Sequence, residues 1–343
     1  MRTVYSEEQR LHVSPGEFGF GAVIPAFETP ERAEIILDRV RHVGLGPVQA
    51  PKHFPPERLT AVHAPALVEF LRTAHAEWSG LERPGAAYPI SWGGGMRRDR
   101  IGGSVDTQLA RYCTDAATPI TATTWPAVVA AADCALTAAE LIAKGERSAF
   151  ALCRPPGHHA GRDFYGGYCF LNNVAIAAQF LREHGAEKLA IIDVDYHHGN
   201  GTQNIFYSRG DVFFTSIHAD SDVEFPFLSG YADEDGFGAG AGANLNLPLP
   251  AGTGWEIWSG ALDRALDGAR RSAADALLVS LGLDTYENDP IAQFRLEGDD
   301  FVCIGERLAT LNVPTVFVLE GGYAVGELGI NAVNVLQGFE GTR

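Results

Sequence analysis

The chain has 343 residues, of which 46% are apolar, and a formal net charge of −17 at pH 7. These values are typical of a globular enzyme with a large core, and the negative charge argues against nucleic-acid binding because it repels phosphates. The sequence has no run of 18 apolar residues and no apolar leader after Met1, so we expect neither a membrane span nor a signal peptide.

The cysteines indicate a reducing compartment. Their number is odd, they are widely separated and none forms a Cys-x-x-Cys pair, so the sequence predicts neither a disulfide framework nor a thiolate metal site. We therefore expect the protein in the cytoplasm. The five cysteines are Cys113, Cys134, Cys153, Cys169 and Cys303.

Apolar strand-like runs alternate with alanine-rich helical stretches along most of the chain. The predicted strands are 150–153, 189–194, 212–217, 276–283 and 315–319. The predicted helices are 127–144, 173–184, 256–274 and 301–311. This alternation predicts an α/β fold with a central parallel sheet flanked by helices. We expect a single domain over residues 1–343, with a long glycine-rich loop insertion at about 79–104.

Every predicted strand is followed by polar residues at its carboxyl end. These segments are 154–159, 193–198, 216–218, 284 and 320–323. Because ligands of parallel α/β sheets bind beyond the carboxyl ends of the strands, we expect an active site at this edge.

The segment I-I-D-V-D-Y-H-H-G, residues 191–199, predicts a metal site. Side chains alternate along a strand, so Asp193, Asp195 and His197 point the same way while the chain stays extended. Buried charge without a partner is costly, and a cation offsets that cost. Oxygen and nitrogen ligands without a thiolate suit zinc or another first-row divalent metal. The alternative is a solvated rim or a hydrogen-bonded acid cluster.

Three further motifs supply candidate residues at the same edge. Asp284 ends S-L-G-L-D and is a third metal ligand, or else a cap of the next turn. His158 and His159 lie in the rigid loop P-P-G-H-H, where imidazoles can transfer protons, although such a pair can also mark a surface loop. Tyr323 follows two glycines and can donate a hydrogen bond to a developing oxyanion, or is an ordinary aromatic of the rim.

The ordered motifs R-P-P-G-H-H, G-G-Y-C-F-L-N-N, D-V-D-Y-H-H-G-N-G-T-Q, S-L-G-L-D and E-G-G-Y resemble those of the histone deacetylase superfamily over nearly the whole chain. The V-Y-S-E opening, Glu17 and the loop around 80–103 most resemble bacterial acetylpolyamine amidohydrolases. The resemblance implies a three-layer arginase-like fold and deacetylation of acetylated amines with one metal ion. That ion would be zinc, with iron(II) or another divalent metal as the alternative.

The resemblance also implies a role for each residue of the catalytic centre. The implied zinc ligands are Asp195, His197 and Asp284, and the implied catalytic residues are His158, His159 and Tyr323. Asp193 would hydrogen-bond to His158, and Asn200 would orient His159. A structural potassium ion would be bound by Asp193, Ser216 and the main-chain carbonyls of Asp195, His197 and Ile217.

The resemblance places aromatic and acidic residues around the substrate. Tyr168 and Phe225 would form the walls of a tunnel, and Glu17 and Asp106 would attract ammonium groups. Two departures leave the amine preference open. The acidic residue of related polyamine enzymes is here the shorter Asp106, and a second acidic position is Ala117, with Asp115 close by.

We expect a small cationic acetylated amine as substrate and a homodimer formed through the 79–104 loop. The loop carries Tyr88, Ile90, Trp92 and Met96, which would be costly to leave in water. Three alternatives remain: a protein-lysine deacetylase, a two-metal ureohydrolase and a non-catalytic amine-binding protein. The ureohydrolase would need a further metal ligand two residues after Asp284, where the chain has Tyr286.

Overall fold

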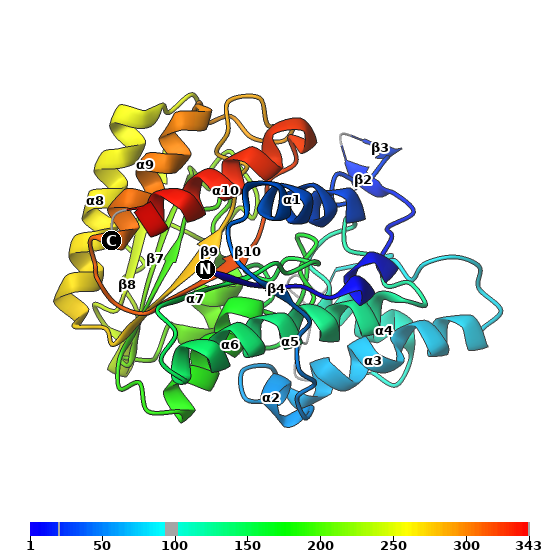
Figure 1. Ribbon diagram of the computed structural model, residues 1–343. Coiled ribbons are helices and arrows are strands. Elements are labelled where there is room, and N and C mark those ends of the chain that lie inside the picture. Colours follow the sequence, from blue (N-terminus) through cyan, green and yellow to red (C-terminus); the bar gives the residue numbers. More distant parts are fainter. Residues whose placement is uncertain (20, 93–101, 342–343) are drawn as a thin grey trace.

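A central parallel sheet organises the molecule (Figure 1). The computed structural model describes residues 1–19, 21–92 and 102–341. Within these residues eight strands pair in the order β4-β1-β5-β10-β9-β6-β7-β8, and every pair is parallel. The strands are β1 (Arg2–Val4), β4 (Val48–Gln49), β5 (Ser148–Ala151), β6 (Leu189–Asp193), β7 (Val212–Ala219), β8 (Asn244–Leu249), β9 (Ala276–Leu281) and β10 (Thr315–Leu319). Outside this sheet, β2 (Glu17–Gly19) and β3 (Ala22–Ile24) form an antiparallel hairpin.

Helices cover both faces of the sheet, which gives three layers (Figure 1). One face carries α1 (Pro30–Val43), α8 (Trp255–Ser272), α9 (Gly298–Ala309) and α10 (Val325–Gly341). The other face carries α3 (Pro65–Gly80), α4 (Val105–Tyr112), α5 (Thr124–Ala143) and α6 (Asn173–Glu183). Shorter elements are α2 (Glu57–Thr60), α7 (Asn200–Phe206) and the 3-10 turns η1 (Glu7–Leu11) and η2 (Gly238–Gly240). The predicted fold class is confirmed.

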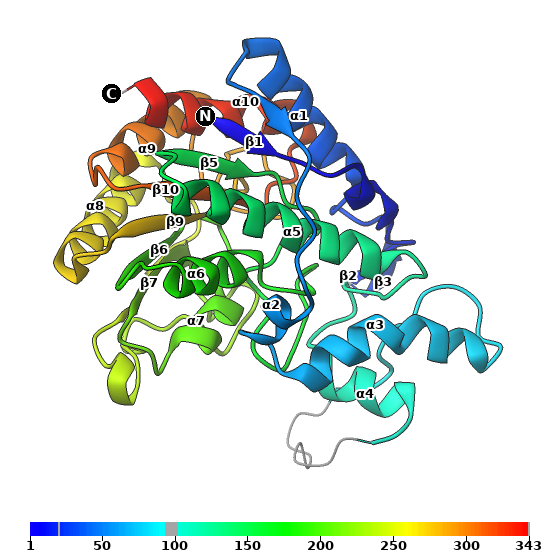
Figure 2. The ribbon, with the colours of Figure 1, turned by 60° about the horizontal axis from the view of Figure 1, so that its bottom comes forward.

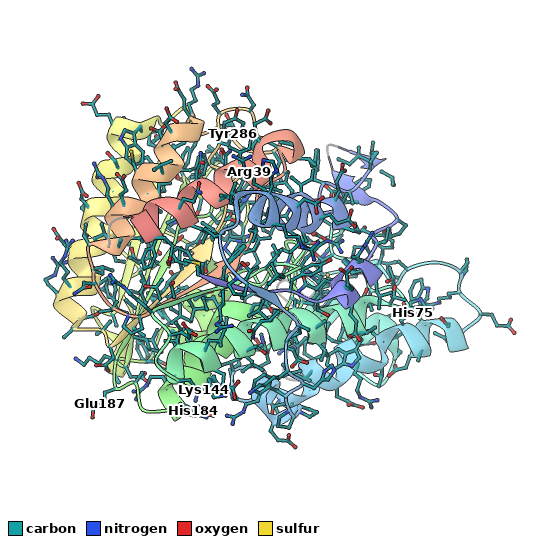
Figure 3. The ribbon with its side chains drawn as sticks, in the orientation of Figure 1. Arg39, His75, Lys144, His184, Glu187 and Tyr286 are labelled. Carbon is teal, nitrogen blue, oxygen red and sulfur yellow. The ribbon has the colours of Figure 1, made fainter. Side chains whose placement is uncertain are left out.

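The sheet separates two hydrophobic cores because successive side chains of a strand point to opposite faces. In β6, Leu189 and Ile191 belong to the core under α5 and α6, whereas Ala190 and Ile192 belong to the core under α8 and α10. Strands buried on both faces have nearly continuous apolar sequences, which is why the central strands could be recognised. Charged side chains such as Lys144 and Glu187 lie at the periphery (Figure 3).

The five predicted strands and four predicted helices are present, with ends within three residues of those expected. The edge strands β4 and β8, and β1 beside β4, were not predicted as strands. Both β1 and β4 contain only two or three residues, too few for a visible alternation, and β8 contains Pro248. Proline is tolerated at β8 because that strand lies at the edge of the sheet.

Helix α5 is the one helix among the described residues that is long and apolar enough to cross a membrane. In the most apolar part of α5, 72% of the residues are buried inside the protein. The helix packs against α6 and β5 in front of the sheet (Figure 2). Its composition is therefore that expected of a helix in the core.

The predicted 79–104 loop begins two residues later than expected, because α3 continues to Gly80. Within the loop, Ala87 pairs with Ile120 through two main-chain hydrogen bonds. Ser104 caps the following helix, α4, by accepting a hydrogen bond from the Thr107 N–H. Residues 93–101, which include Met96, lie outside the described part of the chain.

Buried His63 joins two loops close to the carboxyl edge of the sheet. Its Nδ1 donates to the carbonyl of Gly161 (2.8 Å), and its Nε2 accepts from the N–H of Asn172 (2.9 Å). Burial lowers the pKa of His63 to about 4, although the bond to the Gly161 carbonyl acts in the opposite direction. Protonation of Nε2 would remove the acceptor for Asn172.

We predict that acid destabilises the protein partly through His63. Between pH 6.5 and pH 4 the unfolded chain binds a proton there that the folded chain does not, so stability falls as pH falls. From pH 7.5 to pH 5 this loss should be about 2 kcal/mol for one histidine. Urea unfolding at both pH values measures it. His63→Gln should be less stable at pH 7.5 but should lose less on acidification; equal losses in both proteins would refute the prediction.

Candidate active site

The three predicted metal ligands meet at the carboxyl ends of two neighbouring strands. Asp195 and His197 follow β6, and Asp284 follows β9. His197 Nδ1 lies 3.2 Å from Asp195 Oδ1 and 3.1 Å from Asp284 Oδ2, and all three side chains are buried. One potential ligand atom from each residue lies within 4.8 Å of the others.

The chemistry of this cluster fits a divalent cation. Burial, together with the nearby charge of Asp195, raises the pKa of the Asp284 carboxyl to about 7. Such a pair of buried carboxylates is costly unless positive charge neutralises it. Two oxygens and one imidazole nitrogen also leave coordination positions open for water and substrate, as in catalytic sites of zinc.

Main-chain N–H groups hold the carboxylates in place. Asp195 accepts from His197 N through Oδ1 (2.9 Å) and from Gly321 N through Oδ2 (2.8 Å). Asp284 Oδ1 accepts from Tyr196 N (2.8 Å). These bonds orient the ligands before a metal binds, which is the usual function of groups behind a metal site.

Two glycines let the backbone come close to these carboxylates. A Cβ on Gly282 would lie 2.2 Å from Asp195 Oδ2. A Cβ on Gly321 would lie 2.4 Å from Asp284 Oδ2 and 2.5 Å from Asp195 Oδ2. The glycines of S-L-G-L-D and E-G-G-Y are therefore required by the space that the ligands occupy.

The tandem histidines have different partners. His158 Nδ1 donates to Asp193 Oδ2 (3.0 Å), and His159 Nδ1 donates to Asn200 Oδ1 (2.7 Å). The two buried rings lie 4.0 Å apart, and His158 Nε2 is 3.8 Å from Asp195 Oδ1. In both rings Nδ1 is committed to its partner, and Nε2 is the remaining proton site. The resemblance implied both pairings.

The different partners separate the pKa values of the two histidines. Burial alone would lower the pKa of His158, but the charges of Asp195 and Asp193 outweigh it and raise the pKa to about 10. Burial lowers the pKa of His159 well below its ordinary value, and the positive charge of His158 lowers it further. A cation bound to Asp195 would weaken the field at His158. The neutral His159 is the better proton acceptor of the pair.

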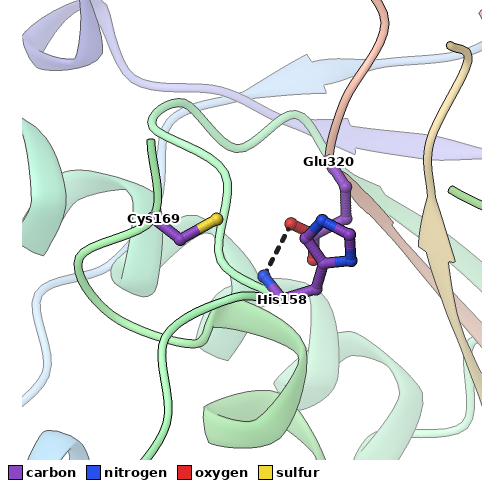
Figure 4. A group of neighbouring side chains, drawn as sticks. All are labelled: His158, Cys169 and Glu320. Carbon is purple, nitrogen blue, oxygen red and sulfur yellow. Dashed lines mark hydrogen bonds between the residues drawn. The ribbon is translucent and has the colours of Figure 1, made fainter. Parts of the chain in front are cut away.

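Glu320 holds the histidine loop against β10, a contact that the sequence did not predict. Its Oε2 accepts from the N–H of Gly157 (2.6 Å) and from the N–H of His158 (3.0 Å). Figure 4 shows the bond from His158. Burial raises the pKa of the Glu320 carboxyl to about 8. Cys169 lies beside this pair, but burial keeps its thiol neutral, and His158 Nδ1 is engaged by Asp193. We therefore interpret this group as structural rather than as a second metal site.

Tyr323 is fixed by two residues from distant parts of the chain. The Arg32 guanidinium lies 4.7 Å from the centre of the Tyr323 ring and donates to the carbonyls of Glu320 and Gly322, both at 2.6 Å. Asp289 Oδ2 accepts from Tyr323 N (2.7 Å). Neither Arg32 nor Asp289 was predicted to have a role, because no local pattern links them to Tyr323.

A cavity of about 340 Å³ opens onto this centre. His159, His197 and Tyr323 line it at the catalytic end. The predicted wall residues also line it: Phe225 lies edge-on to His159 at 4.9 Å, and Tyr168 lies 5.7 Å from Tyr323. The site thus combines a metal cluster, two proton carriers, a phenol and an aromatic pocket.

The predicted acidic substrate residues separate into two groups. Glu17 lines the cavity, and the Tyr168 hydroxyl donates to its Oε1 (3.0 Å). Asp106 is not among the described residues that line the cavity, and Arg83 donates to both of its oxygens at 2.6 and 2.8 Å. Asp115 lines the cavity, but its carboxylate accepts from the N–H groups of Ala117 and Gly167 and therefore organises the loop.

The residues expected at a potassium site are neighbours. Asp193 and Ser216 are paired in register across β6 and β7, and Ile217 is the next residue of β7. Ser216 Oγ lies 2.8 Å from His218 Nδ1. Potassium binding remains a prediction.

The model of the histone deacetylase domain matches residues 26–339. The chain therefore belongs to the histone deacetylase family. Membership of this family implies a divalent metal, and the cluster of Asp195, His197 and Asp284 offers ligands for it.

Full-length relatives carry more specific names. The chain is 52% and 53% identical to acetylpolyamine amidohydrolases 2 and 1 of Pseudomonas aeruginosa, over 99% of both chains in each case. It is 45% identical to the acetylpolyamine amidohydrolase of Mycoplana ramosa, over 99% of this chain and 100% of the relative. The crystal structure of acetylpolyamine aminohydrolase from Burkholderia pseudomallei is 39% identical and superposes with a TM-score of 0.96, covering 100% of this chain and 99% of the other.

We predict that Gly321→Ala abolishes metal binding, because the added methyl group would strike both ligand carboxylates. Gly260→Ala on α8 is the matched control, since a Cβ there meets nothing within 4 Å. Elemental analysis of both purified variants after dialysis measures the bound metal. Gly260→Ala should retain the metal content of the parent protein. Full metal content in Gly321→Ala would contradict the geometry described for the cluster.

Proposed function

We propose that the protein is a metal-dependent amidohydrolase that removes the acetyl group from acetylated polyamines or related small acetylated amines. The products are acetate and a free amine. The observation that carries the proposal is the aromatic cavity that joins Glu17 to His159, His197 and Tyr323. The names of the full-length relatives support the same substrate class.

The chain's own residues account for the proton transfers of amide hydrolysis. A bound divalent cation lowers the pKa of water and polarises an amide carbonyl. His159 accepts the proton that water loses on attacking the carbonyl carbon, and it then protonates the leaving amine nitrogen as the C–N bond breaks. His158, paired with Asp193, stabilises the negative charge that develops beside it during the attack. The Tyr323 hydroxyl donates to the carbonyl oxygen as negative charge develops there.

Zinc is the metal we propose, with iron(II) as the alternative, and potassium is the proposed structural ion.

A two-metal ureohydrolase is disfavoured because, among the described residues near Asp284, the carboxylates needed to bridge two metal ions are missing. Tyr286 packs against Phe301 of α9, at a ring distance of 6.4 Å. Asp289, five residues after Asp284, accepts from the N–H groups of Tyr323 and Ala324, so its carboxylate holds that loop in place.

A small cationic substrate is favoured over an acetylated protein by the acidic lining of the cavity. Glu17 is buried there, and its Oε2 makes no hydrogen bond. Burial raises the pKa of the Glu17 carboxyl, while the Tyr168 hydroxyl lowers it. An ammonium group would supply the missing donor and would favour the ionised form of Glu17.

The function is tested by comparing kcat/KM for N-acetylputrescine, N-acetylspermidine and an acetyl-lysine peptide. We expect the two acetylated polyamines to be the better substrates. Tyr323→Phe should lower kcat by roughly 10²-fold while retaining the metal, because only the oxyanion donor is lost. Tyr286→Phe, outside the cavity, is the control and should leave kcat unchanged. A preference for the peptide would favour the protein-lysine deacetylase instead.

We also propose a cytoplasmic homodimer that forms through the 79–104 loop. Ile90 and Trp92 of this loop are 80% and 45% exposed, and Phe18 on β2 is 58% exposed. Exposed apolar side chains in such number are costly in water, and two-fold pairing would cover them. Light scattering on the purified protein should give twice the chain mass of 36.8 kDa. A mass of one chain at micromolar concentration would rule the dimer out.

A further inference from the structure

We propose that Glu224 is a second cation-binding residue of the substrate pocket and selects amines with an ammonium group beyond the acetamide. This inference rests on the proposed amine deacetylation. Glu224 lies in the loop that follows β7, directly before Phe225, and lines the same cavity as Glu17 and Tyr323. Neither the sequence motifs nor the resemblance gave this residue a role.

The carboxylate of Glu224 is held in a fixed position. The Tyr196 hydroxyl donates to its Oε2 (3.0 Å), and the N–H of Phe225 donates to its Oε1 (3.2 Å). Tyr196 is buried between the metal ligands Asp195 and His197, so Glu224 is tied to the segment that carries the metal site. A carboxylate can accept about four hydrogen bonds, and two tethers leave it able to accept from an ammonium group.

The charge balance of the cavity favours a cationic occupant. Glu17, Asp115 and Glu224 line it, whereas no lysine or arginine is present among its described lining residues. The carboxylate of Asp115 is occupied by main-chain N–H groups, and Asp106 is paired with Arg83 away from the cavity. Glu17 and Glu224 are therefore the carboxylates available to a substrate ammonium group.

The two available carboxylates come from different parts of the fold. Glu17 lies on β2 and accepts a hydrogen bond from Tyr168, one aromatic wall of the cavity. Glu224 directly precedes Phe225, the other aromatic wall. Methylene groups of a slender amine can pack against the aromatic rings while the ammonium group binds a carboxylate. The substrate class that fits is an acetylated diamine or longer polyamine. An acetylated amine without a second nitrogen would gain nothing from Glu224.

The decisive comparison uses two amides of equal length. N-acetylputrescine carries an ammonium group where N-pentylacetamide carries a methyl group. Glu224→Gln removes the charge but keeps an amide oxygen that can accept from Tyr196. We expect this variant to raise KM for N-acetylputrescine roughly tenfold, because a charge-assisted hydrogen bond is lost. Its kcat, and its kcat/KM for N-pentylacetamide, should stay within about twofold of the parent values.

Asp222→Asn is the matched control. Asp222 lies in the same loop and accepts from the Tyr231 hydroxyl, but it is exposed and does not line the cavity. Equal losses for both amides in Glu224→Gln would mean that Glu224 only anchors the loop. An equal effect of Asp222→Asn would mean that net charge alone is responsible. Either result overturns the proposal.

Binding of putrescine, measured by calorimetry on the metal-loaded protein, separates this inference from the proposed reaction. Putrescine retains the ammonium group without the reacting amide. Glu224→Gln should weaken its binding roughly tenfold, and Asp222→Asn should not. One outcome is that the parent protein hydrolyses neither amide while Glu224→Gln still binds putrescine more weakly than the parent does. In that case the proposed reaction fails and the assignment of Glu224 stands. Unchanged binding in Glu224→Gln overturns the assignment whether or not the protein is active.

Discussion

The burial of two carboxylates beside one imidazole is the constraint on which the rest of the site depends. Asp195 and Asp284 are fully buried, with potential ligand atoms within 4.8 Å of each other and of His197. Charges of the same sign at this distance in a dry interior repel strongly, and burial together with this repulsion raises the pKa of the Asp284 carboxyl. Main-chain N–H groups relieve part of the cost, and a divalent cation relieves the remainder. The same cation supplies the chemistry of hydrolysis.

The sheet topology places all parts of the site around this cluster. The strands β10, β9 and β6 are adjacent in the sheet, and their carboxyl ends carry Tyr323, Asp284 and Asp195 respectively. The end of β10 connects three functions. Glu320 holds the histidine loop, the N–H of Gly321 donates to Asp195, and Tyr323 follows two residues after Gly321. A shift of one strand would therefore disturb the metal cluster, the proton carriers and the phenol together.

Short-range sequence patterns were enough to predict the central strands and the polar residues at their ends. Asp195, His197 and Asp284 could be recognised because buried parallel strands are apolar and their carboxyl ends converge. The resemblance to histone deacetylases then gave roles to individual residues, such as Asn200. Contacts between distant segments left no such pattern: Arg32 reaches Gly322 across 290 positions, and Glu320 reaches Gly157 across 163. The pairing of Asp106 with Arg83, 23 positions away, left no such pattern either. The contact of Asp106 with substrate remains a prediction.

The central claim is that one divalent metal, bound by Asp195, His197 and Asp284, is sufficient for catalysis. Its most direct test is a zinc titration of metal-free protein during hydrolysis of N-acetylputrescine. The rate should rise linearly and reach its plateau at one zinc per chain, and Asp284→Ala should show no rise. A plateau at two zinc ions per chain, or full activity before zinc is added, would contradict the account.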